Sequence, residues 1–157
     1  MKKVDSLRAL LLAAVPSLGA DPAKLSLFVD KGKVRAVRSN SLAYETAFTA
    51  TIWIEAFAGD LDALFVPLLS WISAHQPDLI GRPDAEPFTF ESELLDADSS
   101  DIWIEIALTE RVLVERRPNG ALRTTHLTEE PRVDLAGSEQ GGATGWRLLL
   151  DDMTASA

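Results

Sequence analysis

Two long runs of alternating apolar and polar residues constrain this chain more than any other feature. The first covers residues 44–57 (YETAFTATIWIEAF), and the second begins at Ile102 and continues to about Arg116. A two-residue period places successive side chains on opposite faces of a β-strand, so each run predicts a strand with one buried face. Any fold of this sequence has to accommodate both strands in a sheet with one side against a core.

Both strands contain the tetrad Ile-Trp-Ile-Glu, at residues 52–55 and 102–105. If the isoleucines face the core, Trp53 and Trp103 lie on the opposite face, where a monomer normally presents polar groups to water. Two interpretations stay open. The rings pack against each other across paired strands or under the C-terminal segment, or they anchor a subunit contact together with Phe57.

Two amphipathic helices accompany these strands. The first is predicted from about Lys3 to Val15 by apolar residues at steps of three and four, and Pro16 ends or kinks it. The second covers residues 61–75, with Asp60 as its N-cap. Pro67 within it predicts a kink, or a helix that restarts at this proline.

Shorter strands complete the predicted fold. Residues 24–29 and 33–37 flank Asp30-Lys31-Gly32, which predicts a short hairpin with Gly32 at positive φ, and further strands are expected at 88–94 and 121–127. The connections are too short for parallel crossovers, so we predict an α+β fold, an antiparallel β-sheet with two α-helices packed on one face. The expected core includes Leu7, Leu11, Ile52, Ile54, Leu64, Leu68, Ile102, Ile104 and Ile106.

The composition changes after Pro131. The stretch DLAGSEQGGATG contains little that burial could order, and it is followed by Trp146 and by the leucines of 148–150. We therefore predict one α+β domain over residues 1–131 and a flexible Gly-rich C-terminal arm over 132–157. Trp146 is a fourth candidate interface residue, because an apolar tail on a tether can dock on a neighbouring subunit or another protein.

No catalytic or cofactor-binding pattern is present in the sequence. The two histidines, His75 and His126, have no partner at a motif spacing, and neither a HExxH motif nor a phosphate-binding glycine motif occurs. The acidic segment 96–101 resembles a calcium loop, but Asp101 and Ala107 occupy the positions that require Gly and Glu. A solvated turn is the expected structure there. We predict no catalytic residues, no metal and no cofactor.

The charge and hydropathy of the chain limit its partners and its location. The formal net charge is −9, which argues against binding to a nucleic-acid backbone. Asp5 and Arg8 interrupt the N-terminal apolar run, so it resembles an amphipathic helix more than a signal peptide, and no stretch approaches the length of a membrane span. We expect the protein to reside in the bacterial cytoplasm.

Four segments carry a resemblance to the myophage tail completion protein R family: MKKVDSLRALLLAAVP, LSLFVDKGKV, FAGDLDALFVPLLSWISAHQPDL and IEIALTERVLV. The third is the most specific, because general amphipathicity would not produce its combination of Gly-Asp, a helical proline and His-Gln-Pro-Asp. The resemblance runs from Lys2 to about Pro131.

The resemblance implies a non-enzymatic terminator of contractile tails, in a phage or in a headless R-type pyocin (tailocin). Such a protein would form a hexameric ring, or collar, that caps the head-proximal end of tube and sheath and stops their polymerisation. Its implied partners are further copies of itself, the tail tube protein, the tail sheath protein and, in a phage, the head-tail connector. The alternative from another class is a small ligand-binding or regulatory module of bacterial origin, which would need a pocket with convergent polar groups.

Overall fold

The structure, a computed structural model, describes residues 1–36 and 42–128. Its helices are α1 (Lys2–Ala14), α2 (Pro16–Ala20) and α3 (Asp62–His75), with 3₁₀ turns at Pro22–Lys24 and Pro77–Leu79. Its strands are β1 (Leu25–Ala36), β2 (Tyr44–Phe57), β3 (Thr89–Leu94), β4 (Ser100–Arg116) and β5 (Leu122–His126).

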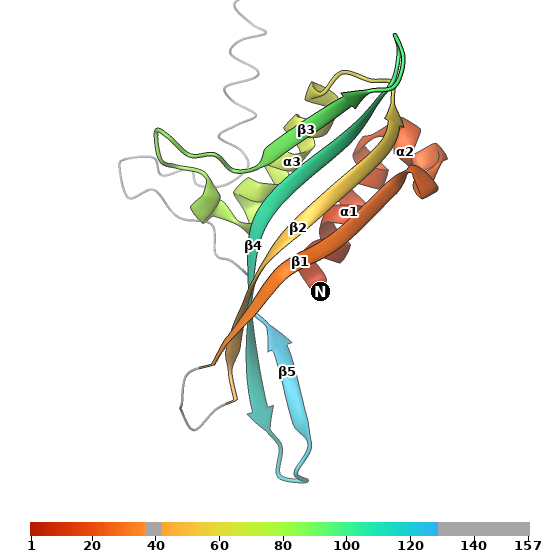
Figure 1. Cartoon of the computed structure of the whole chain (residues 1–157). Helices are drawn as coiled ribbons and strands as arrows, with labels where there is room; N and C mark the ends of the chain where they lie inside the picture. The colour runs from red at the N-terminus through yellow and green to blue at the C-terminus, as the bar shows by residue number, and fades with distance from the viewer. Residues whose placement is uncertain (37–41, 129–157) are drawn as a thin grey trace, which may run out of the picture.

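The five strands form one antiparallel sheet with the order β1-β2-β4-β3, and β5 pairs with the far end of β4. The two strands predicted from alternation, β2 and β4, are its central pair, in a register that matches Ile52 with Ile104 and Ile54 with Ile102. The helices lie behind the sheet on one face (Figure 1). The predicted α+β class is therefore confirmed, with α2 as a short additional helix after Pro16.

The core lies between the helices and the upper half of the sheet. Every residue of the predicted core is buried, and the isoleucines of β2 and β4 are at most 1% exposed. Apolar side chains at a two-residue period on the strands and at three- and four-residue steps on α1 and α3 meet in this layer. The register assigned from the sequence is therefore confirmed.

The hairpin predicted for residues 24–37 is wrong. Residues 25–36 form the single strand β1, which pairs along its length with β2 and carries a register shift between Asp30 and Lys33. Two residues, Lys31 and Gly32, there oppose one residue of β2, and it is Lys31 that has positive φ (51°). The segment Asp30-Lys31-Gly32 is thus a β-bulge and not a turn, because the two parts of β1 gain more from pairing with the long β2 than from pairing with each other.

The start of α3 also differs from the expectation. Its N-cap residue is Leu61 and no side chain caps it, whereas Asp60 contributes only its backbone carbonyl, which accepts a hydrogen bond from Ala63 N. The helix runs through Pro67 as one element, so the alternative of a helix that restarts at this proline is wrong. Burial of Leu64, Leu68 and Trp71 against the core offsets the hydrogen bond lost at the proline.

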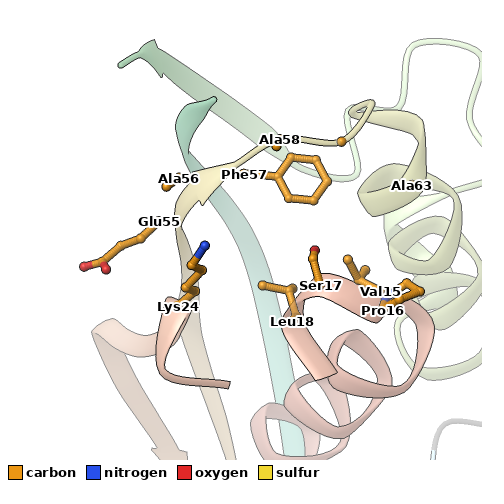
Figure 2. Close-up of a pocket in the computed structure, with 11 residues that line it drawn as sticks. Val15, Pro16, Ser17, Leu18, Lys24, Glu55, Ala56, Phe57, Ala58 and Ala63 are labelled. Carbon is orange, nitrogen blue, oxygen red and sulfur yellow. The ribbon is translucent and has the colours of Figure 1, made fainter. Parts of the chain in front are cut away.

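A second irregularity ends β2. The pairing with β4 shifts between Ile54 and Phe57, and Ala56 has a φ of 45°, a left-handed conformation that costs a non-glycine residue about 1–2 kcal/mol. The shift turns the Phe57 side chain to the helix side of the sheet, where it is 6% exposed. Figure 2 shows its ring pointing away from the side to which Glu55 points.

This geometry makes Ala56→Gly a stabilising substitution. Glycine adopts positive φ without steric cost, so we expect the free energy of unfolding to rise by up to about 1 kcal/mol. Urea denaturation measures the change. Ala50→Gly is the matched control, because Ala50 is fully buried in a regular part of β2. We expect this glycine to lower the free energy of unfolding. Equal destabilisation by both changes would contradict the strain assigned to Ala56.

Candidate subunit interface

Trp53 and Trp103 occupy the sheet face opposite the one on which α1, α2 and α3 pack. They are directly opposed residues of β2 and β4, and their rings stack with centroids 6.2 Å apart and an interplanar angle of 9°. The packing interpretation of the pair is therefore correct within the monomer. Both side chains nevertheless stay partly exposed, and the indole N–H of Trp53 has no acceptor among the described residues. Their role in a subunit contact stays a prediction.

The surroundings of this pair are apolar at the centre and acidic toward one edge. Phe28 of β1 lies on the same face, one row along the sheet, and is 47% exposed. On the opposite side β3 places Glu91 beside Trp103 and Glu93 beside Asp101. A shallow hollow of about 280 Å³ lies there, lined by Glu91, Ser92, Glu93 and Trp103. We call this face, with Phe28, Trp53, Trp103 and the carboxylates of β3, the outer sheet face.

The other two predicted interface residues fall elsewhere. Phe57 packs in the monomer core, because the bulge at Ala56 reverses the face it would have occupied, so its side chain is not available to a neighbour. Alternation alone gave the wrong face for this residue, since it assumes an unbroken period. Trp146 lies outside the described residues, as does the whole predicted C-terminal arm.

A buried polar cluster that the sequence interpretation missed joins the helices to the lower half of the sheet. Glu110 of β4 is 5% exposed, and its Oε1 accepts a hydrogen bond of 2.7 Å from the backbone N–H of Lys3 in the first turn of α1. A carboxylate at this position accepts a hydrogen bond that no carbonyl of the helix itself can accept, and it compensates the partial positive charge of the helix N-terminus. His126 of β5 approaches the same carboxylate, with Nδ1 3.5 Å from Oε2.

Gln76, which is 2% exposed, extends this cluster to the end of α3. Its Oε1 accepts hydrogen bonds from Lys3 Nζ (2.8 Å) and from the backbone N–H of Thr109 (3.1 Å). Its Nε2 donates to Asp78 Oδ1 and to Thr109 Oγ1. The sequence does contain a signal for this cluster. Glu110 is an even-numbered residue of β4 and so lies on the face that packs against the core, where a buried acid needs hydrogen-bond donors.

Two hollows, the one beside Trp103 and a second near α2, bring no set of catalytic side chains together among the residues that line them. The larger, of about 400 Å³, lies between α2 and the end of β2 and is lined mainly by Val15, Leu18, Phe57 and small residues (Figure 2). Lys24 and Glu55 are its only charged side chains, and Glu55 points out of it (Figure 2). His75 stacks on Trp71, and its Nδ1 lies 2.9 Å from the Trp71 carbonyl.

The acidic segment 96–101 forms the turn between β3 and β4. Asp96 Oδ1 accepts hydrogen bonds of 2.8 Å from the backbone N–H groups of both Asp98 and Ser99. These hydrogen bonds, of which that from Asp98 has the largest effect, lower the pKa of Asp96. They therefore stabilise the turn fully at pH values above the ordinary pKa of an Asp carboxyl. This stabilisation is lost as the pH falls through the lowered pKa of Asp96. Among residues 1–36 and 42–128, no three His, Asp or Glu side chains are grouped to hold a metal.

Comparison with known proteins shows what the chain is similar to. The family model described as P2 phage tail completion protein R (GpR) matches residues 1–131. The chain is also 38% identical over 133 residues to the tail completion protein R of Escherichia phage P2, covering 83% of this chain and 85% of that protein. No solved structure matches. Within the part of the chain that the structure describes, no helix is long and apolar enough to cross a membrane.

Proposed function

Because this chain belongs to the P2 phage tail completion protein R family, we propose that it forms the ring that terminates a contractile tail. The family is structural, so the chain is a tail completion component and not an enzyme. In the proposed role, six copies cap the head-proximal end of the tube and sheath and stop their polymerisation. The partners are then the tube protein, the sheath protein and, in a particle with a head, the connector.

The observation that supports self-association is the outer sheet face. Two stacked tryptophans and a half-exposed phenylalanine lie on the side opposite α1, α2 and α3, although a monomer normally keeps such a face polar. Aromatic residues of this kind concentrate binding energy in subunit contacts. A net charge of −9 per subunit opposes association, so the contact has to bury apolar area or pair opposite charges.

A sixfold ring follows from the tail that it closes, since a cap on stacked hexameric discs has to match their symmetry. Copies in such a ring meet through two different surfaces, each repeated at every junction. The predicted C-terminal arm, residues 132–157, supplies a second contact in this proposal, in which Trp146 docks on a neighbouring copy or on the sheath. The protein acts in the host cytoplasm until it joins the particle.

Deletion of the gene tests the terminating role. We expect a strain that lacks the protein to make tails of uncontrolled length, or tails that never finish, and expression of the intact chain in trans to restore a uniform length. Electron microscopy of purified particles gives the length distribution. Tails of normal length with full infectivity or killing activity in the deletion strain would overturn the proposal.

A further inference from the structure

The charges of this chain are separated along β4. Between Arg82 and Arg111 the sequence holds nine Asp and Glu residues and no Lys or Arg, whereas residues 111–123 hold four Arg and one Glu. The acidic stretch includes β3 and the first half of β4, beside the tryptophan pair. The basic stretch is the end of β4 with β5, which we call the basic hairpin (residues 111–127). The two ends of one long strand thus have opposite charge.

The basic hairpin projects away from the helices and the core (Figure 1). Over Val112–Arg116 the strand β4 pairs with β5, whose residues are exposed except for partial burial of His126. Leu113 and Leu122 are 41% and 53% exposed on this ribbon. A two-stranded ribbon is marginally stable in water by itself, so a projection of this kind gains stability when another surface covers it.

The geometry points to a second copy of this chain as that surface: we propose that the basic hairpin of each subunit docks on the outer sheet face of the next. Arginines of the hairpin match the hollow between Glu91, Glu93 and Trp103, where carboxylates pair with a guanidinium and the indole ring attracts it through its face. Leu113, which shares a face of the ribbon with Arg123 and Thr125, complements the aromatic centre. The contact is heterologous, because it joins two different surfaces of the chain. Repeated from copy to copy, it would close the ring proposed above.

The contact cannot form within one subunit. Trp103 and Leu113 lie ten positions apart on the same strand, a separation of about 33 Å at roughly 3.3 Å per residue. Thr125 pairs with Leu113 and Glu91 pairs with Trp103, so these two positions are held equally far apart. The rigid strand therefore forces the basic hairpin toward a different copy.

Disulfide trapping tests this arrangement cleanly, because the chain contains no cysteine. A disulfide requires Cα atoms within about 7 Å, so a chain with Glu91→Cys and Thr125→Cys can crosslink these positions only between copies. We expect its oxidation to give a ladder of covalent multimers that ends at the size of the ring. Each single variant should stay monomeric under denaturing conditions. Symmetric dimers from the single variants, or no ladder from the double variant, would overturn the proposal.

Charge reversal provides an independent measurement. Glu91→Arg with Glu93→Arg on the outer sheet face, or Arg123→Glu on the hairpin face that carries Leu113 and Thr125, should each weaken association of the purified chain at least about tenfold. Mixing the two variants should restore a contact, because each then carries one surface of the reversed pair. Analytical ultracentrifugation measures both effects. Unchanged association of the hairpin variant, with loss of binding to duplex DNA instead, would assign the hairpin to nucleic acid and overturn the proposal.

The outcomes separate this inference from the function on which it rests. A double-cysteine variant that gives no ladder but still restores tail length to the deletion strain would leave the terminating role intact and reject the hairpin contact. A ladder from a protein whose deletion leaves tails normal would reject the terminating role and keep the contact.

Discussion

Glu110→Ala is expected to lower the free energy of unfolding by about 3 kcal/mol, an effect at the upper end for single substitutions. The Glu110 carboxylate is buried, and its removal leaves the backbone N–H of Lys3 without its acceptor and opens space where α1, β4 and β5 meet. Urea denaturation at a protein concentration where the chain is monomeric measures the change. An unchanged m-value shows that the substitution altered stability and not the two-state character of unfolding.

Two control variants define what the side chain contributes. Glu110→Gln keeps an acceptor for Lys3 N at nearly the same volume, so we expect a smaller loss of about 1–2 kcal/mol. Glu115→Ala removes an exposed carboxylate from the same strand and should change stability by no more than about 0.5 kcal/mol. A Glu110→Ala loss as small as that of Glu115→Ala would show that the cluster does not hold α1 on the sheet.

Trp103→Ala is expected to dissociate the proposed ring into monomers at concentrations where the wild-type chain is assembled. A buried aromatic anchor contributes about 2 kcal/mol or more per contact, which corresponds to a roughly 30-fold weaker junction, repeated around the ring. Trp53→Ala should act in the same direction, because it removes the other half of the stack. Sedimentation over a concentration series measures the dissociation.

Loss of the stack also affects the monomer, by about 0.5–1.5 kcal/mol, so thermal unfolding of each variant has to accompany the sedimentation. Trp103→Phe keeps an aromatic ring opposite Trp53 and should retain more of the assembly. Val66→Ala removes an apolar side chain that is 64% exposed on α3 and should leave assembly unchanged. If Trp103→Ala and Val66→Ala associate equally well, the outer sheet face is not the interface.

Local periodicity was enough to predict the elements and their buried faces. β2 has the predicted bounds, and the isoleucines of β2 and β4 face the helices as alternation requires. The two helices follow from apolar residues at three- and four-residue steps. Each of these properties is carried by residues within one segment, so a single sequence contains the information.

The errors concern pairing partners and interruptions of the period. Residues 25–36 have an ordinary hairpin composition, and only the presence of a fourteen-residue partner strand makes them one strand with a bulge. Phe57 changes face because of one residue at positive φ two positions after Ile54. Neither property can be seen in the local pattern, because a bulge depends on what the opposing strand offers.

The α+β class, the core and the family can be predicted from the sequence alone, because alternation, helical spacing and the match over residues 1–131 are all properties of linear order. The stack of Trp53 on Trp103, the hydrogen bond from the first turn of α1 to Glu110 and the separation of the basic hairpin from the acidic face appear only in the folded chain. The physical reason is that these features join residues up to 107 positions apart, and their contacts exist only once the sheet register and the helix positions are set.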